Sequence, residues 1–158
     1  MPRPRVYIET TIPSVYCDRR RAPTMVAKRR WTQAWWEVAL DRYELVTSPV
    51  TVRELEDGPA HRHGEWLALL RNARKLDVPE AADPVAGEYI RQRLMPSRGA
   101  DAFHLAVASL HRCDYLVTWD VQHLANAHKF AQIQKVNMRL GLHVPTIATP
   151  LQMLGRMP

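Results

Sequence analysis

The sequence predicts an α/β protein in which helices cover both faces of a short, parallel β-sheet. Five short segments rich in β-branched, aromatic and aliphatic residues have the character of strands, and longer segments with helical spacing of apolar residues separate them. Strands that alternate with helices pair in parallel and need a helix layer on each side. The chain has 158 residues, 46% of them hydrophobic, and no repeat or linker. We therefore expect one domain over 1–158.

The first half of the chain contains two predicted strands. The segments 5–9 (RVYIE) and 43–47 (YELVT) are short and mostly apolar, β-branched or aromatic, which favours buried strands. A serine–proline pair at 48–49 is a typical helix start, and a glycine–proline pair at 58–59 is a typical stop. The helices predicted in this half are 13–21, 24–41, 49–57 and 61–74.

The second half continues the alternation. The strands predicted here are 76–78 (LDV), 115–119 (YLVTW) and 145–149 (PTIAT). The helices predicted here are 84–94, 100–111 and 122–140, with a short helical tail after Pro150. The helix 100–111 is apolar nearly all round, whereas 122–140 is polar and ends at Gly141.

Composition narrows the class of protein. Cys17 and Cys113 lie far apart and form no paired motif, which excludes a disulfide framework and a cysteine-based zinc site and fits a reducing compartment. The N-terminal residues do not form a signal peptide, and no apolar run approaches the length of a membrane span. We therefore expect a cytoplasmic protein without a membrane partner. The net charge of +6 makes nucleic acid the leading candidate partner.

Basic residues concentrate just before three tryptophans, Trp31, Trp35 and Trp36. The basic positions are Arg19, Arg20, Arg21, Lys28, Arg29 and Arg30. One hypothesis is an arm that binds the phosphates of RNA. The alternative is a solvated helix with its tryptophans packed inward, and the sequence favours neither.

Four acidic residues are predicted at the sheet edge where ligands bind in open α/β folds, the carboxyl ends of the strands. Glu9 ends the first strand, and Asp120 directly follows the fourth. Glu54 lies on the helix after the second strand. Asp101 lies near the start of an apolar helix, where only a function or a cap explains a carboxylate. The sequence therefore predicts that the four acids converge.

Converging carboxylates raise one another's pKa, and a hard divalent cation relieves that repulsion. Ligands that are all oxygen atoms suit Mg²⁺ or Mn²⁺ rather than zinc. Such ions activate water and stabilise the leaving oxygen of a phosphodiester. Together with the basic charge, the acids indicate phosphodiester hydrolysis.

Each acid also has a simpler interpretation. Glu9 fits a solvated strand end, Asp120 fits a helix cap, and Glu54 competes with its neighbours Glu56 and Asp57. The histidines near the acids are weaker candidates. His104 follows Asp101 by one turn and either orients a ligand or is a satisfied core histidine, whereas His123 and His128 are predicted on a polar helix without zinc-site spacing.

The acids and their surroundings resemble the PIN-domain family over nearly the whole chain. The matching segments are VYIETTIPSVY at 6–16, TSPVTVREL at 47–55, GADAFHLAVA at 99–108 and YLVTWDVQHLAN at 115–126. The most specific feature is an Asp that opens an Ala-rich apolar helix, followed by a short hydrophobic strand and Thr-x-Asp. The closing segment 136–150 resembles one prokaryotic branch of the family.

The resemblance implies a Rossmann-like three-layer sandwich and an endoribonuclease dependent on Mg²⁺ or Mn²⁺. Carried over by position, Glu54, Asp101 and Asp120 are catalytic, metal-binding acids, and Glu9 completes the set where most members have Asp. Thr10 and Thr118 fall at hydroxyl positions beside the acids. Many small prokaryotic members are VapC-like toxins neutralised by an antitoxin, and many pair as homodimers. RNA, an antitoxin and a second copy are thus the expected partners.

Glu9 is the departure from the family pattern. Its extra methylene displaces the carboxylate by about one carbon–carbon bond, whereas Mg²⁺ demands near-ideal octahedral geometry. The alternative function is therefore a catalytically weak PIN fold that acts as an RNA- or protein-binding module. We expect instead a site adapted to Glu9, because two β-branched residues and a proline stiffen the turn 10–13 that follows.

Overall fold

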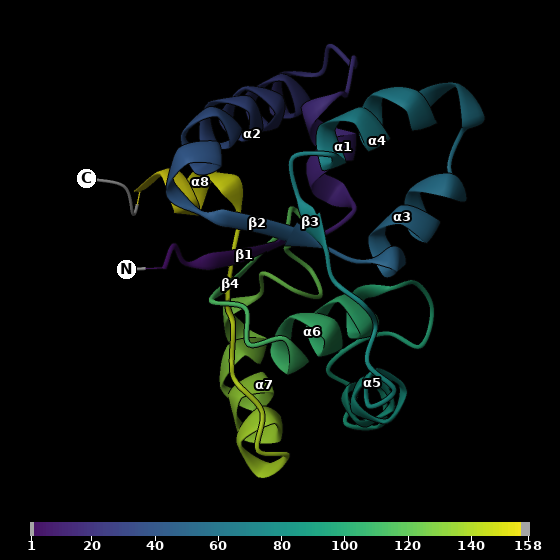
Figure 1. Ribbon diagram of the computed structural model, residues 1–158, viewed down its shortest axis with the longest axis vertical. Helices are drawn as coiled ribbons and strands as arrows, with labels where there is room; N and C mark the ends of the chain where they lie inside the picture. Colours follow the sequence, from purple (N-terminus) through teal and green to yellow (C-terminus); the bar gives the residue numbers. More distant parts are fainter. Residues whose placement is uncertain (1, 156–158) are drawn as a thin grey trace.

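A five-stranded parallel sheet in the order β3–β2–β1–β4–β5 runs through the middle of the protein (Figure 1). The computed structural model describes residues 2–155. The strands are β1 (Arg5–Ile8), β2 (Glu44–Thr47), β3 (Arg74–Lys75), β4 (Tyr115–Val117) and β5 (Thr146–Ala148). Helices cover both faces of this sheet, so the predicted three-layer α/β sandwich is confirmed.

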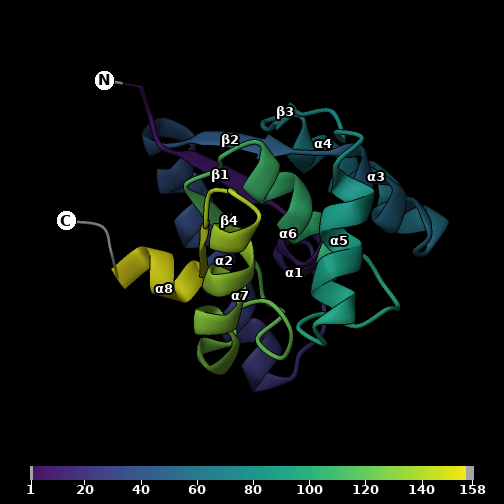
Figure 2. The same cartoon turned by 90° about the horizontal axis from the view of Figure 1, so that it is seen from below.

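The helices divide into two layers (Figure 1). Their bounds are α1 (Thr11–Tyr16), α2 (Pro23–Arg42), α3 (Pro49–Glu56), α4 (His63–Leu70) after a 3₁₀ turn η1 (Ala60–Arg62), α5 (Ala82–Arg91), α6 (Asp101–Leu110), α7 (Ala127–Arg139) and α8 (Pro150–Gly155). Helices α1, α2, α4 and α8 lie on one side of the sheet, and α5, α6 and α7 lie on the other. Helix α6 is central in its layer, between α5 and α7 (Figure 2). Within residues 2–155, no helix combines the length and apolarity needed to cross a bilayer.

The sheet separates two hydrophobic cores, and alternation along the strands feeds both. In β1, Val6 and Ile8 pack into the core under α1, α2, α4 and α8, while Tyr7 between them packs into the core under α5, α6 and α7. Successive strand residues point to opposite faces, so a strand with a helix layer on each side is apolar at every position. In β4, Leu116 and Val117 divide between the cores in the same way.

Several predicted elements have different bounds in the structure. The strand predicted at 76–78 is wrong, because β3 lies at Arg74–Lys75 and Leu76 only extends it by donating a backbone hydrogen bond to the Thr47 carbonyl (2.8 Å). Both β3 residues are exposed at the sheet edge, so no apolar alternation marks the strand. The helix predicted at 61–74 begins as the turn η1 and ends at Leu70, and the helix predicted at 13–21 starts and ends earlier, as α1.

The helix predicted at 122–140 begins five residues later, at Ala127. The Asn126 side chain caps α7 by accepting a hydrogen bond from the His128 backbone N–H (3.0 Å). Residues 121–125 form a turn instead, held by Leu124 and Ala125 backbone N–H groups that donate to the Asp120 carbonyl. This turn brings the segment after β4 back over the carboxyl edge of the sheet. The predicted helix stop is confirmed, because Gly141 adopts φ +71° directly after the helix end.

Candidate functional site

The four acids predicted as a site lie around the carboxyl edge of the sheet. Glu9 directly follows β1, and Asp120 follows β4 by three residues. Glu54 lies in the second turn of α3, and Asp101 is the first residue of α6. The charges of Asp101 and Glu54 both act on the Glu9 carboxyl, and those of Asp120 and Glu54 act on Asp101. The acids therefore form one electrostatically connected group.

Asp101 and Asp120 meet at His123, which the sequence pattern predicts on a helix. His123 lies instead in the turn after β4, with its Nδ1 3.2 Å from Asp120 Oδ2 and 3.3 Å from Asp101 Oδ2. One ligand atom from each of these three residues lies within 4.8 Å of the others, a spacing that could hold a metal ion. The sequence signal that could have identified His123 is its position three residues after Asp120. A helical interpretation of 122–140 obscures that signal.

Asp120 also organises the turn that carries His123. Its Oδ1 accepts backbone hydrogen bonds from Gln122 (3.2 Å) and His123 (3.0 Å). The backbone N–H of Asp120 donates to Thr118 Oγ1 (2.9 Å), so Thr118 fixes the start of the turn. The simpler interpretation of Asp120 as a cap is thus partly correct, but the capped element is a turn. Its other oxygen, Oδ2, faces Asp101 and His123.

The pair of aspartates is poised to share one proton. Burial, followed by the hydrogen bond and the negative charge of Asp120, raises the pKa of Asp101. Burial also opposes ionisation of Asp120, but hydrogen bonds from Asp101 and from the backbone and ring of His123 outweigh it and hold the pKa of Asp120 below its usual value.

Glu9 is almost completely enclosed, with 1% of its surface exposed. Its Oε1 accepts hydrogen bonds from the Thr11 backbone N–H (2.7 Å) and the Thr11 hydroxyl. Burial raises the pKa of Glu9 to about 8; the Thr11 hydrogen bonds oppose this shift, and the charges of Asp101 and Glu54 add to it. Among the described residues, none donates a hydrogen bond to Oε2. The interpretation of Glu9 as a solvated strand end is therefore wrong.

Glu54 is held by a chain of side chains that starts at the cap of its own helix. The Ser48 hydroxyl lies 2.7 Å from the Tyr7 hydroxyl, which lies 3.0 Å from Nδ1 of the fully buried His104. Nε2 of His104 lies 2.9 Å from Glu54 Oε1, which also accepts a hydrogen bond from the Thr10 hydroxyl. If Nε2 carries the proton, Nδ1 accepts from Tyr7 and every member of the chain is paired.

This chain sets the charge state of Glu54. Burial opposes its ionisation, but the hydrogen bonds from His104 and Thr10 outweigh burial and keep the pKa of Glu54 below its usual value. Its sequence competitors lack these partners, since Glu56 is exposed and Asp57 is exposed at the rim of a cavity. Glu54 is thus ionised at neutral pH, whereas Glu9 is largely protonated.

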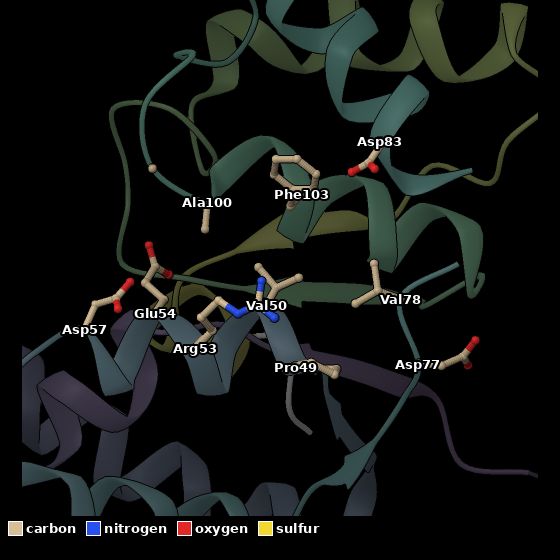
Figure 3. Close-up of a pocket in the computed structure, with 11 residues that line it drawn as sticks. Pro49, Val50, Arg53, Glu54, Asp57, Asp77, Val78, Asp83, Ala100 and Phe103 are labelled. Atoms are coloured by element: carbon tan, nitrogen blue, oxygen red, sulfur yellow. The ribbon is translucent and has the colours of Figure 1, made fainter. Parts of the chain in front are cut away.

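A cavity of about 670 Å³ opens beside the acids, between α3, α6 and the segment before α5 (Figure 3). Glu54 lies at one end of it, with its carboxylate directed towards Ala100. Glu9, Asp101 and Asp120 do not line this cavity. The cavity therefore adjoins the acid group through Glu54 and does not enclose it.

Half of the six basic residues before the tryptophans are engaged in local contacts. Arg20 forms an ion pair with Asp18 (2.7 Å), and Arg29 donates to the Asp18 carbonyl (2.7 Å). Arg19 forms an ion pair with Glu65 (3.3 Å). Within residues 2–155, Arg21 and Arg30 are exposed and have no acidic partner. These positions are therefore not equivalent as contacts for phosphate.

The raised pKa values predict an unusual pH dependence of stability. Between about pH 4.5 and 8, the folded protein binds more protons at Glu9 and Asp101 than the unfolded chain does, so stability falls as pH rises. Glu54 and Asp120 have lowered pKa values and lose their contribution only below this window. We expect Mg²⁺ or Mn²⁺ to raise the Tm more at pH 8 than at pH 5.

Thermal unfolding with and without the cation measures this effect. Glu56→Gln removes an exposed acid from the same helix as Glu54 and serves as the control. It should show the same cation-dependent shifts in Tm as wild type. Equal shifts in Tm at both pH values would show that the raised pKa values are not relieved by a cation.

Sequence comparison finds no match to this chain, whereas structural comparison finds proteins of similar fold. No protein-family model matches the chain, and no curated protein matches its sequence. The fold is similar to VapBC2 from Rickettsia felis bound to a promoter DNA fragment, with 13% identity, a TM-score of 0.61 and coverage of 92% of this chain and 98% of that chain.

Two further structures are similar over the same share of the chain. FitAcB from Neisseria gonorrhoeae has 15% identity to this chain and a TM-score of 0.59. The match covers 92% of this chain and 97% of the FitAcB chain. FitAB bound to an IR36 DNA fragment has 15% identity and a TM-score of 0.55, and covers 92% and 95%. At these identities the likeness is one of fold, and that fold is PIN-like.

Proposed function

We propose that this protein is a divalent-metal-dependent endoribonuclease in which Glu9, Glu54, Asp101 and Asp120 are the catalytic, metal-binding acids. The observation that carries the proposal is the meeting of Asp101, Asp120 and His123, with ligand atoms within 4.8 Å of one another. The net charge of +6 over the whole chain supports a polyanionic substrate. The PIN-like fold is consistent with a nuclease.

The donor atoms fit Mg²⁺ or Mn²⁺. Carboxylate oxygens suit both ions, and a divalent cation would offset the negative charge of Asp120 that helps to raise the pKa of Asp101. Glu9 Oε2, to which none of the described residues donates a hydrogen bond, is a further ligand atom. His123 Nδ1 is within hydrogen-bond distance of Asp120 Oδ2 and also lies 3.3 Å from Asp101 Oδ2, so the ring would help to hold both aspartates in position around the ion.

When bound, the cation would supply positive charge for the phosphate and would lower the pKa of water towards the neutral range. Glu54 is available as a proton acceptor, because its carboxylate is ionised at neutral pH and is held in place by Thr10 and His104. It would take the proton of the attacking water as general base. Asp120, anchored by the turn it caps, would keep its Oδ2 directed at the same centre.

A toxin role is the cellular setting we propose. The structural neighbours are toxin–antitoxin complexes, and two of the three contain DNA. By analogy, this chain would pair with an antitoxin protein, and a homodimer is the expected assembly. One observation favours a second candidate, a catalytically weak binding module. Glu9 is almost completely buried, and burial raises the pKa of its carboxyl to about 8, which weakens its attraction for metal at neutral pH.

The deciding experiment is cleavage of single-stranded and structured RNA with Mg²⁺, Mn²⁺ or EDTA. We expect cleavage only with a divalent cation, because four clustered acids otherwise repel the phosphate. A DNA strand of the same sequence serves as the substrate control. Undiminished cleavage in EDTA would exclude the metal mechanism, and binding without cleavage under all conditions would favour the binding module.

A further inference from the structure

We infer that Trp31 and Lys28 of α2, resting on Trp119, form a stacking site for a nucleobase of single-stranded RNA beside the acid group. We call these three residues the Trp31 platform. The inference rests on the proposed function and adds the residues that would hold the substrate strand. It also separates the tryptophans of α2, since Trp35 and Trp36 are buried and Trp31 is 36% exposed.

The platform offers an exposed aromatic ring on a fixed support. The rings of Trp31 and Trp119 are stacked, with centroids 6.2 Å apart and planes inclined by 28°. Trp119 is buried, and its indole N–H donates to the Thr32 hydroxyl (2.8 Å). Its backbone N–H donates to the Thr11 hydroxyl (2.8 Å). A base that stacks on Trp31 would therefore meet a surface already ordered, which lowers the entropic cost of binding.

A cation accompanies the ring. Lys28 precedes Trp31 by three residues on α2, so the two side chains are neighbours on the helix surface. The Lys28 ammonium lies 5.4 Å from the centroid of the Trp119 ring. In the described part of the chain, Lys28 forms no ion pair with a carboxylate. Its charge is thus available to the phosphate of a nucleotide whose base stacks on Trp31.

The platform is tied to the acid group through two residues. Trp119 directly precedes Asp120 in the chain. The Thr11 hydroxyl, which accepts the Trp119 backbone hydrogen bond, donates to the Glu9 carboxylate. A strand held on Trp31 would therefore lie close to the proposed catalytic centre.

The surroundings favour nucleic acid over a protein partner. The other large apolar side chain exposed on α2 is Leu40, nine residues further along the helix, so Trp31 is not part of a continuous apolar stripe on α2. Its chain neighbour Arg30 is exposed and forms no ion pair with any residue of the described range 2–155. Aromatic stacking accepts any base that is not paired in a duplex, so the site fits a single strand and tolerates different sequences.

Binding of a short, fluorescently labelled single-stranded RNA in EDTA tests the platform without cleavage. The second probe is the same ribose–phosphate strand without bases. We expect Trp31→Leu, which keeps apolar packing on Trp119, to weaken binding of the RNA about tenfold, equivalent to about 1.4 kcal/mol. The abasic strand should bind as it does to wild type. Trp31→Phe should retain most of the affinity, and Leu40→Ala, the matched control on the same helix, should retain all of it.

Lys28→Ala should weaken binding of both strands and reduce the log–log salt slope by about 0.7. Unchanged RNA affinity in Trp31→Leu would overturn the platform, as would an equal loss on both strands. So would a variant that changes only self-association, measured by sedimentation, because that result makes Trp31 a protein contact. If wild type never cleaves RNA but binds it through Trp31, the platform stands and the nuclease proposal fails. If wild type cleaves RNA and Trp31→Leu does not change RNA affinity, the nuclease proposal stands and the platform fails.

Discussion

Asp101→Asn and Asp120→Asn should each reduce RNA cleavage by roughly 10²–10³-fold while the protein stays folded. An amide keeps the shape of each side chain but removes the negative charge that would bind the cation, which contributes several kcal/mol to the transition state. The amide oxygen in Asp120→Asn would still accept the backbone hydrogen bonds of Gln122 and His123, so the turn after β4 should persist. Initial cleavage rates at saturating Mn²⁺, together with thermal unfolding, measure both effects.

Asp83→Asn is the matched control, because Asp83 lies in the first turn of α5 as Asp101 lies in the first turn of α6. It is exposed and outside the acid group, and its substitution should leave cleavage unchanged. Wild-type rates in both site variants would show that Asp101 and Asp120 have only a structural role.

Glu9→Gln should nearly abolish cleavage and at the same time stabilise the metal-free protein at pH 8. The amide cannot ionise, so the variant avoids the cost of placing a charge in a buried position whose carboxyl pKa is raised to about 8. A gain of about 1 kcal/mol would raise the Tm by about 2–4 °C for a chain of this size. The same substitution removes a proposed ligand, so the stabilisation by Mn²⁺ should shrink.

Glu9→Asp distinguishes an adapted site from a decayed one. The shorter side chain withdraws the carboxylate by about 1.5 Å, so it loses either the Thr11 hydrogen bonds or its reach towards the other acids. We therefore expect impaired cleavage and weaker metal affinity. Increased cleavage in this variant would support the decayed-site interpretation and the binding module. Full activity and full metal affinity in Glu9→Gln would remove Glu9 from the site.

Much of the fold was predictable because its signals are local. β1, β2 and β4 are central strands with both faces covered, so they are buried at nearly every position, and their aliphatic and aromatic residues stand out in the sequence. The Ser48–Pro49 start of α3 and the Gly141 stop of α7 depend on the conformations of one or two residues. Parallel strands end at one edge, so these elements also indicated where Glu9 and Asp120 would lie.

The sequence by itself therefore determined the layered architecture and the edge at which the acids lie. Only the tertiary structure decided how side chains distant in sequence pair there. It placed His123 between two aspartates by forming a turn where a helix was predicted. It placed Thr11 where it hydrogen-bonds Glu9, and it placed His104 beside Glu54, fifty residues away in the sequence. It also engaged Arg19 and Arg20 with nearby acids while leaving Trp31 exposed. Such pairings follow from packing across the whole chain, which no local pattern of residues encodes.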